Sequence, residues 1–241
     1  MRTIPVLVLL FIVTYTVNAQ TYQSIPKSSI ISSRYVSPDT LYMRMYRNGI
    51  RYGDYRLSIS AMQSLYALHP DSIKYLDTLS IMYSETQEYA SCILSGDQVL
   101  RSRPDDIEVI EAVAISNQHI GRYEEALRLF KAEYDKNSSI YANYQIAVLQ
   151  YSLQKPGDAQ ATLDRLMTDK RALTDKIGFS TSANTTQQVL YKAAAENLMG
   201  IIYQDLKDIA KAKKCFQDAL AIQPDFVLAQ NNLSALEKKE K

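Results

Sequence analysis

Apolar residues recur through most of the chain at the three- and four-residue spacing that is typical of amphipathic helices. Met62 and Leu65, for example, share one face of a helix that is predicted to end before Pro70. The breaks between helices recur as well. Pro70 and Pro104 are 34 residues apart, and another 34 residues lead to Ser138, which lies in a polar break. Proline ends a helix because it lacks an amide donor and clashes with the preceding turn. The pattern predicts helix pairs with a period of about 34 residues.

The segment 193–226 shows the repeat most completely. Its first half contains a Met-Gly pair and a tyrosine, and its second half contains small and aromatic residues before a closing proline: Met199, Gly200, Tyr203, Ala212, Phe216, Ala219 and Pro224. These residues and spacings resemble the tetratricopeptide repeat, although Glu196 replaces the usual tryptophan of that family. The resemblance implies a pair of helices in this segment.

The resemblance extends backwards along the chain. The stretch 121–126, Gly-Arg-Tyr-Glu-Glu-Ala, resembles the turn between the two helices of a tetratricopeptide unit, and 155–158, Lys-Pro-Gly-Asp, predicts another turn. We therefore expect five units, at 39–72, 73–106, 107–140, 141–168 and 193–226. Residues 169–186 exceed the period, and we expect an inserted loop there, or a loop followed by an extension of the next helix.

The expected fold class is all-α: an α-α superhelix, or tetratricopeptide-type solenoid, of about five helix pairs plus a C-terminal capping helix over 227–241. Only seven glycines and seven prolines are present, which favours continuous helices over a β-sandwich. Stacked neighbours must supply most of the core, because one helix pair cannot bury its apolar face alone. Gly200 and two alanines, Ala212 and Ala219, are predicted at close helix crossings, with Tyr203 and Phe216 filling the gaps between units.

The N-terminus has a different pattern. Residues 1–3 form a short, positively charged segment, and residues 4–13 are apolar apart from Pro5. Residues 17–19 are the compact residues that a signal peptidase recognises. This pattern predicts a signal peptide over 1–19 and hence an exported protein, in the periplasm or outside the cell.

The apolar run of the predicted signal is about half of the roughly 20 residues that span a bilayer. No second long apolar stretch exists, so we expect no transmembrane segment after cleavage. No cysteine follows the run, which argues against a lipid anchor. Residues 20–38 are predicted to form a polar, extended or poorly ordered leader.

Charge and cysteine content narrow the class of partner. Arg2 is the one charged residue in the predicted signal, so the remaining chain carries 26 basic and 26 acidic side chains. A neutral chain has no general attraction for nucleic acid, which is therefore not an expected partner. Cys92 and Cys215 lie among apolar helical neighbours and are predicted to be buried free thiols.

Motifs for catalysis, cofactors and metals are missing from the sequence. The glycines are scattered, so they form no phosphate-binding loop, and the Gly-x-Ser-x-Gly pattern does not occur. His69 and His119 lie in no cluster with metal-ligand spacing, although His69 can meet the last carbonyls of a helix. The sequence therefore predicts a protein that is not an enzyme and holds no cofactor or metal.

In the family that the chain resembles, ligands bind in a concave groove lined by the first helices of successive units. These positions, together with Tyr46 beside Arg47, give the candidate partner-binding residues of this chain. They are Met43, Tyr46, Arg47, Asp77, Ile81, Glu111, Ile115, Gln145, Leu149, Asn197 and Ile201. The family's two-carboxylate clamp needs several Lys, Arg and Asn at such positions, and Asp77 and Glu111 argue against it.

Residues 42–56 have the most unusual composition, with four tyrosines and four arginines. Arginine and aromatic residues can stack on bases, but the predicted export favours contact with a peptide, a glycan or an anionic polymer. The alternative is that Tyr42, Met45 and Tyr46 pack in the core of the first unit while the arginines stay solvated.

The sequence favours an exported scaffold that binds a protein or peptide in the concave groove without catalysis. Two alternatives stay open. One is a structural component of a cell-envelope assembly or secretion complex, which self-association would support. The other is a glycan-binding accessory protein.

Overall fold

The computed structural model describes residues 36–180 and 185–239, so the predicted signal peptide and the predicted leader before Val36 lie outside the described residues. Within the described residues, eleven α-helices follow one another: α1 (Pro38–Tyr52), α2 (Tyr55–Leu68), α3 (Ile73–Glu85), α4 (Tyr89–Ser102), α5 (Ile107–His119), α6 (Tyr123–Asn137), α7 (Ile140–Ser152), α8 (Pro156–Thr168), α9 (Tyr191–Asp205), α10 (Ile209–Ile222) and α11 (Val227–Lys239).

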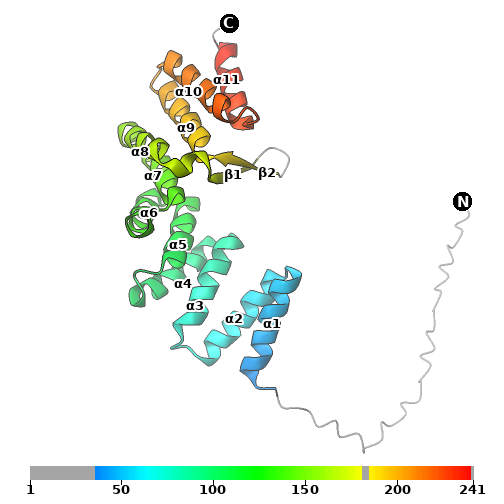
Figure 1. The fold of residues 1–241 in the computed structure, drawn as a ribbon. Coiled ribbons are helices and arrows are strands. Elements are labelled where there is room, and N and C mark those ends of the chain that lie inside the picture. The colour runs from blue at the N-terminus through cyan, green and yellow to red at the C-terminus, as the bar shows by residue number, and fades with distance from the viewer. Residues whose placement is uncertain (1–35, 181–184, 240–241) are drawn as a thin grey trace, which may run out of the picture. The chain divides into compact units, whose positions relative to one another are not determined.

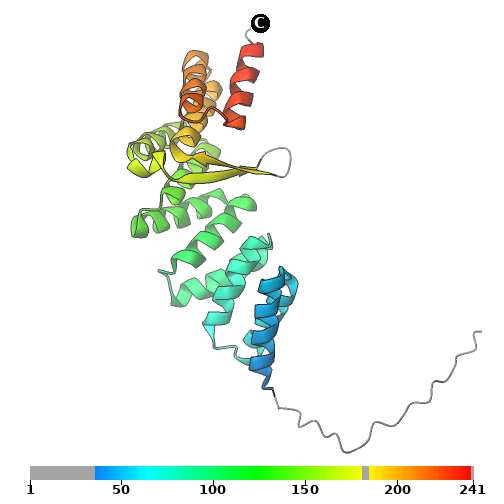
Figure 2. The same cartoon turned by 45° about the vertical axis from the view of Figure 1, so that its right-hand side comes forward.

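The helices pack as consecutive pairs (Figure 1 and Figure 2). α1 packs on α2, α3 on α4, α5 on α6, α7 on α8 and α9 on α10, and each second helix also contacts the first helix of the next pair. α11 packs mainly on α10 and ends the array. This arrangement confirms the predicted superhelix of about five helix pairs with one terminal helix. None of the helices described is long and apolar enough to cross a bilayer.

Every pair turns through a residue with left-handed backbone geometry. The φ angle is 71° at Gly53 and 80° at Gly121, and three residues other than glycine take the same place in the remaining pairs: Gln87, Gln154 and Lys207, with φ of 64°, 58° and 65°. This geometry brings a Cβ atom close to a backbone carbonyl, so it favours glycine. The turn therefore repeats in structure even where its glycine is missing from the sequence.

Aspartates fix the start of the helix that follows some of these turns. The Asp54 Oδ1 accepts a hydrogen bond from the Leu57 amide at 3.0 Å, and the Asp208 Oδ1 accepts one from the Lys211 amide at 3.1 Å. Each cap satisfies an amide that has no partner inside its own helix. Because each aspartate directly follows a left-handed residue, turn and cap together set where α2 and α10 begin.

The stacked pairs share an apolar core. Buried side chains of α2 to α7 form one cluster, and those of α7 to α11 form a second. The predicted close crossing in the last pair is present, because a Cβ atom on Gly200 would lie 2.5 Å from the Phe216 ring, and Ala212 and Ala219 are fully buried. Phe216 fills the space beside this crossing, and Tyr203 packs there partly buried.

The two cysteines are buried free thiols, as predicted. Burial raises the pKa of Cys92 to about 11, and it raises the pKa of Cys215 to about 11 as well. Both thiols are therefore protonated at neutral pH and behave as small apolar side chains.

The region between α8 and α9 is not the loop that the sequence predicted. A 3-10 helix, η1 (Lys170–Leu173), leads into two antiparallel strands, β1 (Lys176–Ser180) and β2 (Thr186–Leu190). Ile177 pairs with Val189 across the strands, and both side chains are buried. The prediction was wrong because β2 does not alternate apolar and polar residues: its two apolar residues, Val189 and Leu190, are adjacent. The alternative of an extended helix also fails, since α9 begins at Tyr191.

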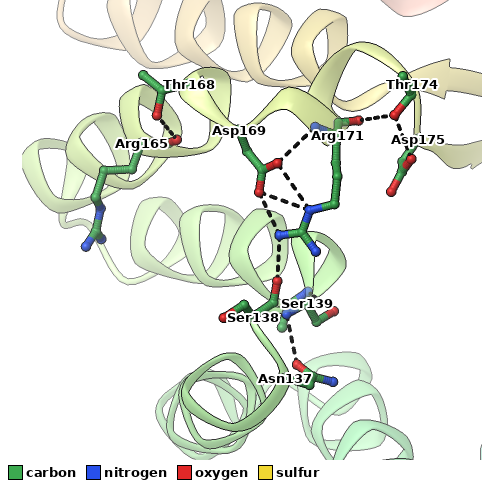
Figure 3. Close-up of polar contacts among 10 residues, drawn as sticks. Asn137, Ser138, Ser139, Arg165, Thr168, Asp169, Arg171, Thr174 and Asp175 are labelled. Carbon is green, nitrogen blue, oxygen red and sulfur yellow. Dashed lines mark hydrogen bonds and ion pairs between the residues drawn. The ribbon is translucent and has the colours of Figure 1, made fainter.

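Arg171 fastens the start of this insertion to the turn between α6 and α7 (Figure 3). Its Nη2 donates to the Ser138 carbonyl at 2.8 Å and to the Asp169 Oδ2 at 2.6 Å. The Asp169 Oδ1 accepts the Arg171 amide at 2.9 Å. A guanidinium is a rigid, planar group with several donors, so these bonds fix the orientation of η1 on the turn as well as its distance from the turn.

The turn between α10 and α11 holds the other side of the hairpin. Gln223 spans the outer edge of β2, where its Oε1 accepts the Leu190 amide at 3.0 Å and its Nε2 donates to the Gln188 carbonyl at 3.1 Å. Gln187 donates to the Asp225 carbonyl at 2.6 Å. A side-chain amide thus replaces a third strand along β2.

Candidate binding groove

Three of the predicted groove residues come together between α3 and α5. Ile81 of α3 and the two residues Glu111 and Ile115 of α5 line one hollow of about 250 Å³. The four-residue spacing places Glu111 and Ile115 on one face of α5, and α5 packs directly against α3. The structure therefore puts these residues on a shared surface, while their role in binding stays a prediction.

Four residues that were not predicted complete the hollow: Ser84, Glu85, Glu108 and Ala112. Each lies within about one helical turn of a predicted residue, so same-face spacing on the two helices could have found them. The Ser84 hydroxyl donates to the Ala112 carbonyl at 3.3 Å and links α3 to α5 there.

Glutamates surround the apolar part of this hollow. Glu85 and Glu108 are exposed, and Glu111 is partly buried. Burial raises the pKa of Glu111, and the neighbouring charge of Glu108 raises it further. Within residues 36–180 and 185–239, the ion pairs of the chain leave all three glutamates without a basic partner. The hollow is apolar inside and negative at its rim.

Two other predicted groove residues have polar partners within the chain. Asp77 accepts a hydrogen bond from the Arg103 guanidinium, which also forms an ion pair with Asp106 at 3.0 Å. Gln145 accepts a hydrogen bond from the Gln118 amide at 3.2 Å. The Gln145 contact joins neighbouring units, and Arg103 links α3 to the start of α5, so both predicted residues also serve the packing of the array.

Leu149 does not face the groove, which corrects the prediction. Its side chain is 0% exposed and belongs to the core. The reason is a shortened repeat, because the turn residues Gly121 and Gln154 lie one residue closer together in the sequence than Gln87 and Gly121. One residue rotates a helical side chain by about 100°. This step turns Leu149 from the groove toward the core.

Asn197 is likewise buried, at 4% exposed, so it is not available to a partner. The terminal helix α11 covers it, and Asn232 donates a hydrogen bond to its Oδ1 at 2.9 Å. Ile201 is partly buried against the cluster that includes Leu236. The terminal helix α11 therefore covers the surface of α9 that was predicted to bind a partner.

The hairpin covers the corresponding face of α7. After the shortened repeat, Tyr144 takes the place on α7 that Glu111 has on α5. Tyr144 is 5% exposed because it packs edge-on against Phe179 of β1 and Tyr191 of α9, with ring centroids 6.3 and 6.0 Å away. The hollow between α3 and α5 lies beyond this covered stretch.

The tyrosine- and arginine-rich stretch 42–56 divides into packed and exposed residues. Met43, Tyr42 and Tyr46 pack partly buried against the core, whereas Arg47 is exposed. Tyr52 is 78% exposed. Packing accounts for Tyr42 and Tyr46, as the alternative predicted, but Met43 and not the predicted Met45 packs on the core cluster beside them. Arg47 and Tyr52 are left on the surface.

A buried carboxyl group that was not predicted lies on α6. Glu133 is 1% exposed, and its Oε2 has no hydrogen-bond partner among the described residues. Burial raises the pKa of Glu133, the nearby side chains of Ser139 and Asn137 oppose this shift, and the negative charge of Glu111 adds to it. The equivalent position of the other pairs holds a fully buried apolar residue: Leu65, Val99, Leu166 and Ala219.

The histidines take part in contacts between helices. The His69 amide meets the last carbonyls of α2, and its ring Nε2 contacts the Asp39 carboxylate of α1 at 2.5 Å. The His119 ring stacks on Tyr89 with centroids 4.5 Å apart. In the part of the chain that the structure describes, no three or more His, Cys, Asp or Glu side chains are grouped to hold a metal ion.

Comparison with known proteins bears on the fold. Residues 193–226 match the family described as Tetratricopeptide repeat. The crystal structure of a MamA protein is 16% identical, with a TM-score of 0.63 over 78% of this chain and 92% of that chain. MamA 41-end from Desulfovibrio magneticus RS-1 is 12% identical, with a TM-score of 0.64 over 80% of this chain and 98% of that chain.

YrrB, described as a TPR protein with an unusual peptide-binding site, is 13% identical, with a TM-score of 0.62 over 79% of this chain and 89% of that chain. Comparison with curated protein sequences gives no match. At these identities the similarity concerns the fold alone. The described helices therefore have a tetratricopeptide-type fold, and residues 193–226 carry the sequence signature of that repeat.

Proposed function

We propose that the protein is an exported scaffold that binds a peptide or a protein segment in the groove of its first helices, without catalysis. The observation that carries the proposal is the hollow between α3 and α5, where Ile81, Glu111 and Ile115 lie on one surface. The proposed location, periplasmic or secreted, rests on the signal pattern of residues 1–19.

The chemistry of the hollow suits recognition of a side chain on an extended segment. Ile81, Ala112 and Ile115 supply apolar contact, which drives association, and the glutamates at the rim supply selectivity. These residues lie on two packed helices, so little conformational freedom is lost when a partner binds. The peptide-binding site named for YrrB, a protein of similar fold, supports the same kind of function here.

Affinity capture of the mature chain, residues 20–241, tests the proposal. The chain is crosslinked in the native envelope fraction, and the captured material is identified by mass spectrometry. We expect one or two proteins in a defined ratio. Recovery of the chain alone would favour a self-assembling structural component instead, and recovery of glycan fragments would favour a glycan-binding accessory protein.

A matched pair of variants locates the binding surface. Ile115→Ala removes apolar contact inside the hollow, whereas Leu94→Ala removes it from α4, where Leu94 is 76% exposed and outside the hollow. We expect Ile115→Ala to lose most of the captured partner and Leu94→Ala to retain it, with unchanged helical circular dichroism in both. Equal capture by the two variants would contradict binding at the hollow.

N-terminal sequencing tests the proposed export. The protein is recovered from the periplasm and the medium of the expressing cells. We expect a mature chain that begins at Gln20. A chain that stays in the cytoplasm with Met1 intact would contradict export.

A further inference from the structure

We infer that the hollow between α3 and α5 accepts a lysine or arginine side chain from an extended segment of the partner. The inference rests on the proposed binding function of the groove and specifies the chemistry of its occupant. Three properties of the hollow carry it: its size, the polarity of its wall and the charges at its rim.

The hollow has the size and wall that a long basic side chain requires. Its volume of about 250 Å³ equals that of roughly eight water molecules at about 30 Å³ each. This space is large enough for the methylene groups of lysine or arginine. Ile81, Ala112 and Ile115 form the apolar wall, and basic side chains commonly pack their methylene groups on such surfaces while the charge stays at the rim.

The charge at the rim selects against other occupants. An apolar side chain would remove water from the Glu111 carboxylate without supplying a cation, which is unfavourable for an ionised group. An acidic side chain would meet repulsion from Glu85, Glu108 and Glu111. A basic side chain satisfies both the apolar wall and the carboxylates.

Carboxylates next to the hollow differ from those inside it. Asp77, one turn before Ile81 on α3, pairs with Arg103, and so does Asp106 at the start of α5. The three glutamates of the hollow have no such internal partner among the described residues, so a cation from outside the chain complements them.

Nuclear magnetic resonance of the mature chain, labelled at the isoleucine methyl groups, tests the inference. The resonances of Ile81 and Ile115 are assigned with Ile81→Val and Ile115→Val. The probes are the peptides acetyl-Gly-Gly-X-Gly-Gly-amide, in which X is lysine, norleucine or glutamate. We expect the lysine peptide to shift both resonances and to bind about fivefold more tightly than the norleucine peptide at low salt, with no shift from the glutamate peptide.

Charge-neutral variants show whether the glutamates cause this preference. Glu108→Gln combined with Glu111→Gln should reduce the lysine peptide to the affinity of the norleucine peptide, whereas Glu124→Gln on α6 should leave it unchanged. Equal affinity for lysine and norleucine in the unmodified chain, or no shift at Ile81 and Ile115, overturns the inference.

The peptide test and partner capture fail separately. A captured partner with no response to the lysine peptide refutes this inference and leaves the proposed function intact. A response to the lysine peptide without any captured partner supports the inference and contradicts the proposed function.

Discussion

Replacing Glu133 with leucine should stabilise the protein. The side chain is 1% exposed, and its Oε2 lacks a hydrogen-bond partner among the described residues. Leaving a buried polar group unsatisfied typically costs about 1–3 kcal/mol. Leucine is already tolerated at the equivalent positions, since Leu65 and Leu166 are both 0% exposed. We therefore expect Glu133→Leu to raise the free energy of unfolding by about 1–3 kcal/mol at pH 7.

The pH dependence of the stability gain distinguishes removal of a buried carboxyl group from a simple improvement in packing. The pKa of Glu133 is raised in the folded state. The folded chain therefore binds this proton more tightly than the unfolded chain, and the unmodified protein loses stability as pH rises from the ordinary carboxyl pKa through the raised one. The advantage of Glu133→Leu should grow over that interval and shrink below it. Glu133→Gln should gain less, because its amide stays polar and buried.

Thermal and urea unfolding, followed by circular dichroism between pH 4 and pH 8, measure the effect. Each kcal/mol corresponds to roughly 2–4 °C in melting temperature for a domain of this size. Asp135→Asn on the same helix is the control, because Asp135 is exposed. A loss of stability in Glu133→Leu at pH 7, or an advantage that does not change with pH, would refute the reasoning.

Three further predictions follow from particular contacts. Gly200→Leu should lower the free energy of unfolding by about 1–3 kcal/mol or more in urea titrations, because even a Cβ atom there would lie 2.5 Å from the Phe216 ring; an unchanged midpoint would contradict the close crossing. Lys207→Gly should raise the free energy of unfolding by about 1 kcal/mol, and with it the melting temperature, because Lys207 has a φ of 65°; a lower melting temperature would show that the strain is absent. Arg47→Ala should keep its helical circular dichroism and lose part of the partner capture, because Arg47 is exposed at this end of the groove; capture equal to that of the unmodified chain would contradict a contact there.

The fold was predictable because its period appears directly in the sequence. Proline breaks at Pro70 and Pro104 and the complete unit 193–226 were enough to predict the stacked pairs. The hairpin was not predictable, because its buried pair, Ile177 and Val189, becomes recognisable only when the two strands are aligned. Apolar residues alternate in 176–180 but not in 186–190, where Val189 and Leu190 are adjacent, so the two stretches do not share a strand pattern.

The candidate site was predictable where the repeat is regular and not where it changes. Ile81, Glu111 and Ile115 follow the regular spacing of the repeat and lie together. The position of Leu149 was predicted wrongly because the repeat that contains it, between the turns at Gly121 and Gln154, is one residue shorter than the one before it. Asn197 was misplaced because a sequence motif does not reveal which surface the terminal helix covers.

The hairpin changes how the array can be shortened. In simple repeat arrays each unit contacts its neighbours alone, so units can be removed from either end. Here Phe179 of β1 packs on both Tyr144 of α7 and Phe226, which precedes α11. This contact links helix pairs to the terminal helix across α9 and α10. Deleting Phe226 together with α11 should therefore disturb packing as far back as α7. Removing α1 and α2 loses one interface, so we expect unfolding to begin at the N-terminal pair.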